Sequence, residues 1–251
     1  MLVLLVEYAS MYAIYCMNVR KLLAGGDKNT SISELSPNPL SIEFEVNNWR
    51  LSELIVERLV PVVGIHPFPL NELQLMTGAV VRFQPQLILE WGTHIGKAAR
   101  IFYEVTSALG LESTVHSIDL PDDVEHGEHP HEQRGMLVHG INEVKLHQGD
   151  GLDTSFAIMK KSRKNSNGEG VLFFVDGDHS YRSVKRELSR IMKDAPKATV
   201  LLHDSFYQDS KSKYNIGPYK AIDEVLKKYK TKYKRIDTKT GLPGMTLLYP
   251  S

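Results

Sequence analysis

Cysteine is nearly missing from this sequence, which has only Cys16 among its 251 residues. A single cysteine excludes an internal disulfide framework and a multi-cysteine zinc site, and it suits a reducing compartment. We therefore expect a cytoplasmic protein. An excess of charge of one sign is missing too, because 30 Lys and Arg residues balance 30 Asp and Glu residues. No overall field draws such a chain to nucleic acid or to an anionic membrane, so we expect no nucleic-acid partner.

A long, uninterrupted hydrophobic run is also missing. The most apolar stretch, residues 1–17, contains Glu7 and is slightly short for a membrane span. A charged side chain at the centre of a bilayer costs roughly 2.5–3.5 kcal/mol on insertion scales. The stretch also lacks the basic start and the cleavage site of a secretory signal. We expect residues 1–23 to form a packed or interfacial helix, with a membrane anchor as the less favoured alternative.

The rest of the chain divides by composition. Residues 24–41 are rich in Gly, Ser, Asn and Pro, which predicts a linker and places the start of the fold near Ile42. Two helical patterns follow, one over 51–59 that should end at Pro61 and one over 71–83 with Asn71 as its N-cap. We therefore expect one domain over 42–251, with a helical cap at 42–84 and a sheet-forming part at 85–251.

From residue 87 onward, short apolar runs alternate with helical patterns. The runs lie at 87–89, 115–120, 144–148, 171–175 and 199–202, the helical patterns at 96–110, 184–192 and 218–229, and a terminal hairpin at 233–236 and 245–249. This alternation predicts an α/β fold with a doubly wound, mostly parallel seven-stranded sheet, an antiparallel C-terminal hairpin and N-terminal cap helices. Sheets of this kind bind ligands beyond the carboxyl ends of their strands.

An acidic residue stands at the end of every parallel strand that we expect. These residues are Glu90, Asp119, Asp150, Asp176 and Asp204. Clustered carboxylates repel one another, so the arrangement predicts a cationic ligand or a metal that balances their charge.

The turn after the first strand contains Gly92 and Gly96, which let the backbone come close to a ligand. It matches neither the Gly-x-Gly-x-x-Gly pattern of dinucleotide-binding folds nor the P-loop.

The segment EWGTHIG resembles the first motif of class I S-adenosylmethionine-dependent methyltransferases, and the resemblance covers roughly residues 86–250. It implies that Glu90, Gly92 and Gly96 lie beside the methionine part of the cofactor. It also implies that Asp119 holds the two ribose hydroxyls and that Asp150 lies near the adenine.

Two further segments, FFVDGDHSY and VLLHDSF, resemble the metal-dependent O-methyltransferases of the cephalosporin hydroxylase-like and macrolide-sugar groups. The resemblance implies a divalent metal, magnesium in that family, on Asp176, His203 and Asp204. An acidic or amide residue is usual at the position of His203, and magnesium prefers oxygen ligands. Three interpretations stay open: His203 supports a ligand, the site takes a softer metal, or no metal binds.

His179 stands where the sugar-modifying relatives have their general base. An unperturbed imidazole has a pKa of about 6.5 and can accept a proton near neutral pH. The alternative is structural, with His179 capping the following helix or bonding Asp178. We favour the catalytic role because the spacing from Asp176 matches.

These observations predict an S-adenosylmethionine-dependent O-methyltransferase that acts on a hydroxyl of a small molecule, such as a sugar or natural product. The alternatives are a nicotinamide-dependent oxidoreductase, an oxygenase with iron on a His/acid triad, and a cofactor-binding protein without activity. A loop with His126, His129 and His131 resembles a transition-metal site, although we interpret these histidines as surface or substrate-contacting residues. The sequence leaves a homo-oligomer open.

Overall fold

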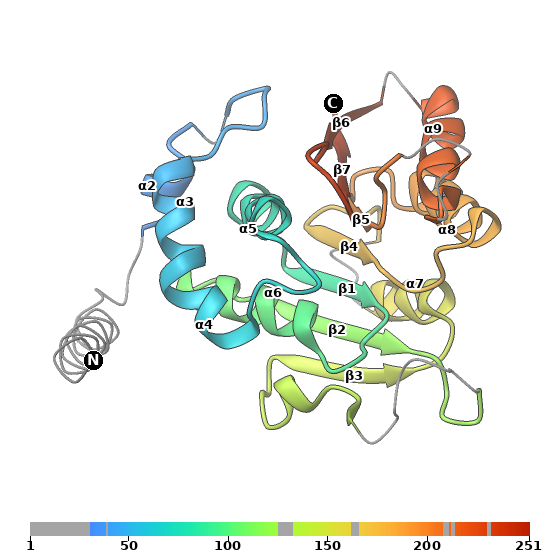
Figure 1. Ribbon diagram of the computed structural model, residues 1–251, viewed down its shortest axis with the longest axis horizontal. Coiled ribbons are helices and arrows are strands. Elements are labelled where there is room, and N and C mark those ends of the chain that lie inside the picture. Colours follow the sequence, from blue (N-terminus) through green and yellow to red (C-terminus); the bar gives the residue numbers. More distant parts are fainter. Residues whose placement is uncertain are drawn as a thin grey trace, which may run out of the picture.

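A computed structural model describes residues 31–38, 40–124, 133–161, 166–207, 211, 214–229 and 232–251 (Figure 1). The helix expected at 1–23 lies outside these residues, as do the three histidines of the 126–131 loop. No helix among the described residues is long and apolar enough to cross a membrane.

The described residues form one seven-stranded sheet, as expected. Its strands are β1 Leu87–Trp91, β2 Thr114–Asp119, β3 Val144–Gln148, β4 Val171–Val175, β5 Thr199–His203, β6 Tyr233–Asp237 and β7 Met245–Pro250. Their order is β3-β2-β1-β4-β5-β7-β6; β7 pairs antiparallel with both β5 and β6, and the other pairs are parallel. The chain progression reverses between β1 and β4, so a ligand crevice is expected at the carboxyl ends of these two strands.

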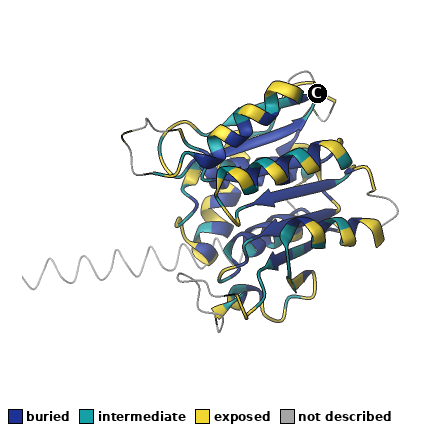
Figure 2. Ribbon diagram, turned by 90° about the vertical axis from the view of Figure 1, so that its right-hand side faces the viewer, coloured by how far each residue is buried: buried dark blue, intermediate teal, exposed yellow. Residues whose placement is uncertain are grey.

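Helices cover both faces of the sheet. One face carries α5 Leu70–Phe83 and α6 Lys97–Ala108, and the other carries α7 Gly151–Lys161, α8 Tyr181–Asp194 and α9 Gly217–Tyr229 (Figure 1). The central strand β4 shows why both layers are needed, because Phe174 packs into one core and Phe173 into the other. Figure 2 shows the buried strands between helices whose outer faces are exposed.

The cap begins with one long helical segment made of α3 Asn48–Leu54, a π-helical turn η1 at Ile55–Leu59, and α4 Val60–Val63. The prediction that this helix ends at Pro61 is wrong, because Pro61 lies inside α4 and the segment ends at Gly64, whose φ is +71°. A proline inside a helix lacks an N–H and crowds the carbonyl four residues earlier. The wide turn just before it relaxes that conflict.

Two boundaries in the cap differ from expectation. Helix α5 begins at Leu70 after Pro69, and the Asn71 side chain is not its N-cap but donates to Thr240 Oγ1 at 2.9 Å. A short helix α2, Ile32–Leu35, lies inside the stretch expected to be a linker. Its Leu35 is fully buried, and the Leu35 carbonyl accepts the Asn47 N–H at 2.7 Å. The packed structure therefore begins before Ile42.

Candidate active site

The acid expected to end the first strand lies one residue before its last residue, Trp91, and is deeply buried. Glu90 has 1% of its surface exposed, and no hydrogen bond from the described residues reaches either carboxylate oxygen. The nearby Ser117 hydroxyl bonds instead to Thr93 at 2.7 Å. Burial raises the pKa of Glu90 to about 8, although the closeness of Ser117 opposes the shift. A buried carboxyl without a partner at a ligand-binding edge favours a cationic group or a proton.

The turn after β1 leaves no room for a side chain. Gly92 has a φ of +91°, and a Cβ there would lie 2.4 Å from the carbonyl oxygen of Asp176. Gly96, with a φ of +87°, would place a Cβ 3.1 Å from Gly135 Cα and from Val138 Cγ2. Close packing of the turn against the segments after β4 and β2 therefore requires both glycines.

Asp119 ends β2 and is held by three donors. Its carboxylate accepts the N–H of Leu120 at 2.9 Å and the N–H of His94 at 3.3 Å. The guanidinium of Arg134, which the sequence patterns did not single out, lies 3.4 Å away. These contacts fix the carboxylate at the strand end.

Asp150 has two structural partners. One carboxylate oxygen accepts the N–H of Asp153 in the first turn of α7 at 3.0 Å, and the other accepts from Arg186 at 2.8 Å. Burial raises the pKa of Asp150, but the Asp153 N–H and Arg186 outweigh it and hold the pKa below its ordinary value. The structure thus gives Asp150 a role in capping α7, and the adenine contact stays a prediction.

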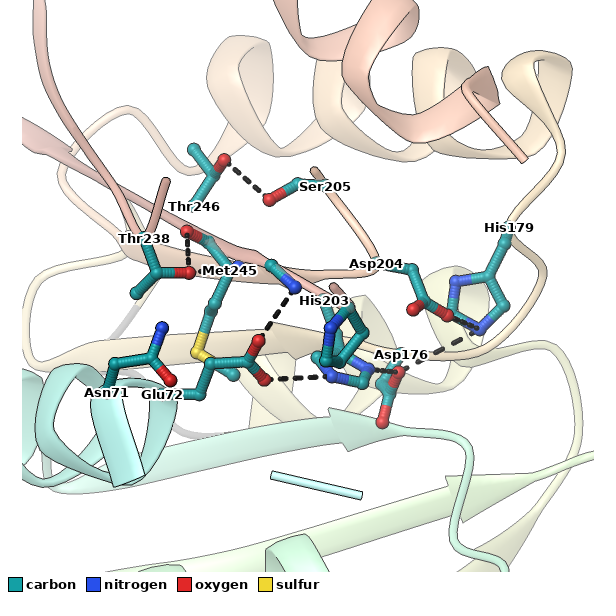
Figure 3. A network of polar contacts seen from close by, with 12 residues as sticks. Asn71, Glu72, Asp176, His179, His203, Asp204, Ser205, Thr238, Met245 and Thr246 are labelled. Carbon is teal, nitrogen blue, oxygen red and sulfur yellow. Dashed lines mark hydrogen bonds and ion pairs between the residues drawn. The ribbon is translucent and has the colours of Figure 1, made fainter. Parts of the chain in front are cut away.

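The structure brings the three expected metal ligands together. Asp176 follows β4, His203 is the last residue of β5, and Asp204 comes next with a φ of +53°. One ligand atom from each lies within 4.8 Å of the others (Figure 3). Left-handed backbone is unfavourable for an aspartate outside a turn, so the surrounding structure must hold Asp204 in place. Tyr214 contributes, because its hydroxyl donates to Asp204 Oδ1 at 2.6 Å.

His203 lies between two carboxylates. Its Nδ1 is 2.8 Å from Asp176 Oδ1, and its Nε2 is 3.1 Å from Oε2 of Glu72 in α5 (Figure 3). Burial lowers the pKa of His203, but Asp176 and Glu72 outweigh it and raise the pKa to about 10 in the absence of a cation. Glu72 was not expected at this site.

His179 points toward the same carboxylates. Its Nε2 is 3.4 Å from Asp204 Oδ2 and 3.8 Å from Asp176 Oδ1 (Figure 3). The alternative role as a helix cap is not supported, because the hydroxyl of Ser180 caps α8 by accepting the Ser183 N–H at 3.2 Å. Asp178 in turn accepts from Ser180. The imidazole of His179 is therefore available at the site, with 31% of its side chain exposed.

A family model described as a methyltransferase domain matches residues 89–205, from β1 to just beyond β5. These residues are therefore similar to a methyltransferase domain. The fold of the chain is similar to that of the O-methyltransferase from Bacillus cereus in complex with SAH, with a TM-score of 0.52 and 13% identity over 88% of this chain and 100% of that one. This finding confirms the resemblance that the glycine turn and the strand-end acids predicted.

Two further solved structures share the methyltransferase fold. The O-methyltransferase TomG from Streptomyces achromogenes, in complex with SAM, has a TM-score of 0.52 and 14% identity over 84% of this chain and 92% of that one. The apo-structure of CmcI has a TM-score of 0.51 and 15% identity over 72% and 71%. A search of curated proteins finds no match.

Proposed function

We propose that this methyltransferase transfers a methyl group to a hydroxyl oxygen of a small molecule, such as a sugar or natural product, with His179 as the general base. The observation that carries the proposal is the place of the His179 imidazole, partly exposed and within 4 Å of two strand-end carboxylates. The similarity to the O-methyltransferases from Bacillus cereus and Streptomyces achromogenes supports oxygen as the acceptor atom.

The residues at the β1 and β2 ends fit S-adenosylmethionine. The unpartnered carboxyl of Glu90 suits a cationic ligand, and the bare backbone at Gly92 and Gly96 lets a ligand come close. The fixed carboxylate of Asp119 would accept the ribose hydroxyls, and Asp150 would lie near the adenine. When bound, the cofactor would supply a methyl group on a sulfonium centre.

The residues at the β4 and β5 ends fit a divalent metal. Two carboxylates and one imidazole nitrogen, from Asp176, Asp204 and His203, converge within 4.8 Å. A cation there would lower the pKa of a hydroxyl placed beside it. Because Asp204 Oδ1 accepts from Tyr214, the other oxygen of Asp204 and the carboxylate of Asp176 would face both the ion and His179.

The base has the support that proton transfer requires. A neutral His179 can accept the hydroxyl proton at Nε2, the nitrogen that faces Asp204 and Asp176. The imidazolium that forms would carry its new proton on the nitrogen nearest the two carboxylates, and their negative charge would stabilise it. Fixing the base before the acceptor binds also removes part of the entropic barrier.

The test combines mass spectrometry with one substitution. Purified protein is analysed for bound S-adenosylmethionine, then incubated with it and a panel of nucleotide sugars, glycosides and phenols, and methylated products are measured. His179→Ala should lower turnover of the best acceptor by about 10²–10⁴-fold with nearly unchanged cofactor affinity. The exposed His139 provides the control variant His139→Ala, which should keep full activity. Cofactor binding without any methylated product would favour the non-catalytic alternative, and full activity of His179→Ala would reject the base.

A further inference from the structure

Glu72 is a buried carboxylate that belongs neither to the glycine turn nor to the group of acids at the strand ends. It belongs to the cap helix α5 and has none of its surface exposed. Its Oε1 accepts the N–H of Gly244 at 2.7 Å, and its Oε2 meets His203 Nε2 at 3.1 Å (Figure 3). A carboxylate so fully removed from water is costly unless each oxygen has a partner, and here both do.

The contact between Glu72 and Nε2 determines whether the other ring nitrogen, Nδ1, can bind a cation. A carboxylate oxygen accepts hydrogen bonds, so Nε2 of the His203 ring keeps its proton, and a cation would displace only the proton on Nδ1. Nδ1 then faces Asp176 and Asp204. The ring cannot easily turn away, because 6% of its side chain is exposed and Phe68 packs edge-on against it with centroids 4.9 Å apart. Metal-binding histidines commonly donate their second N–H to a carboxylate in this way.

The spacing of the donor atoms agrees with a shared cation. Two ligands about 2.1 Å from one ion, at a right angle, lie about 3 Å apart. His203 Nδ1 and Asp176 Oδ1 are 2.8 Å apart. With a cation in place of the Nδ1 proton, the donor set would be two carboxylates and one neutral imidazole. Magnesium favours oxygen ligands, whereas imidazole nitrogen suits the divalent transition metals.

We propose that Glu72 is a positioning residue that presents His203 Nδ1 to a cation on Asp176 and Asp204, so that the site selects a divalent transition metal over magnesium. This inference rests on the metal site of the proposed function. The proposed metal differs from the magnesium that the sequence resemblance implies. Glu72, the residue responsible for the difference, lies in the cap helix α5.

Glu72→Gln is the sharpest perturbation because it keeps the shape of the side chain. The fixed Gly244 N–H needs an acceptor and takes the amide oxygen, which turns the amide NH₂ toward His203 Nε2. An NH₂ only donates, so Nε2 must become the acceptor and the ring proton moves to Nδ1. Nδ1 then no longer offers a lone pair to a cation.

Calorimetric titration of the purified chain with Co²⁺ and with Mg²⁺, without cofactor or acceptor, tests the inference. We expect wild type to favour Co²⁺, and Glu72→Gln to weaken Co²⁺ binding about 10–100-fold, the usual effect of losing the partner of a metal-binding histidine. Mg²⁺ affinity should change much less. His203→Asn, which offers an amide oxygen, should lower the ratio of Co²⁺ to Mg²⁺ affinity in the same direction. The visible absorption of bound Co²⁺ should change in both variants, because it responds to the nitrogen ligand.

The matched control is Glu104→Gln, the same substitution at a buried glutamate of α6 that pairs with Arg58 and Arg100 far from these strand ends. It should leave both metal affinities unchanged. Thermal unfolding identifies a variant that fails to fold, and if Glu72→Gln does so, His203→Asn decides the question in the same titration. An affinity ratio equal to that of wild type in the folded variants, or a wild type that binds neither ion, would overturn the inference. Neither result bears on methyl transfer by His179, which the product assay measures separately.

Discussion

The buried Glu90 makes the stability of this protein depend on pH in a direction opposite to that of most carboxylates. Its pKa is raised from an ordinary value of 4.5 to about 8, chiefly by burial. Between these two values the folded chain binds more protons than the unfolded chain, so stability falls as pH rises. One pKa unit corresponds to about 1.4 kcal/mol, and the shift is therefore on the order of 4–5 kcal/mol once pH exceeds both values.

Glu90→Gln removes this titration and nearly keeps the side-chain volume. We expect the variant and wild type to differ little near pH 5, and the variant to become the more stable of the two by roughly 4–5 kcal/mol at pH 9. Urea unfolding at steps of pH, in the absence of cofactor, measures the difference, and groups that titrate in both proteins cancel. Glu57→Gln, at an exposed position, should give a flat difference. A difference for Glu90→Gln that stays constant from pH 5 to 9 would refute the argument that burial holds this carboxyl protonated.

Three further predictions follow from single residues. Asp119→Ala should weaken S-adenosylmethionine binding by about 1.5–3 kcal/mol for each ribose hydrogen bond lost, and calorimetry that shows unchanged affinity in the folded variant would remove Asp119 from the cofactor site. Gly92→Ala should destabilise the chain far more than Gly64→Ala. Both glycines have a positive φ, but a Cβ at Gly92 would lie 2.4 Å from the Asp176 carbonyl oxygen, whereas a Cβ at Gly64 would meet nothing within 4 Å. Equal urea midpoints of the two variants would contradict this. Leu35→Ala should cost about 2–5 kcal/mol if α2 belongs to the core, whereas a loss below 1 kcal/mol would show that the helix contributes little.

Much of the sheet could be predicted because its central strands are buried on both faces. The run at 171–175 coincides with β4, because a continuous run of aliphatic and aromatic residues leaves little freedom for a boundary. The run at 144–148 coincides with the edge strand β3, although only Val144 in it is buried. Helix α7 escaped prediction for the converse reason. Only Leu152, Ser155 and Met159 of its residues are buried, which is too sparse a pattern to show a helical period.

The cluster at the β4 and β5 ends could also be predicted, because adjacent parallel strands end at the same edge of the sheet. Asp176, His203 and Asp204 meet there as expected. The supporting contacts could not be predicted in the same way. Arg134 reaches Asp119 and Tyr214 reaches Asp204 from loops, and no periodic pattern marks such contacts.

Glu72 is the most instructive omission. A glutamate three residues after a proline, at the start of an amphipathic helix, is typical of a solvated first turn, where negative charge is favourable. The contact that buries it joins positions 131 residues apart, which local patterns do not report. Two signals nevertheless point to it together. Helix α5 is apolar around most of its circumference from Leu73 to Val81, so a charge within it needs a partner. At the end of β5, His203 stands where the resemblance to metal-dependent O-methyltransferases implies an acid or amide. Its second ring nitrogen is buried and requires a hydrogen-bond partner, which Glu72 provides. Burying either the Glu72 carboxylate or the His203 ring alone would be costly, and in the structure each is the hydrogen-bond partner of the other.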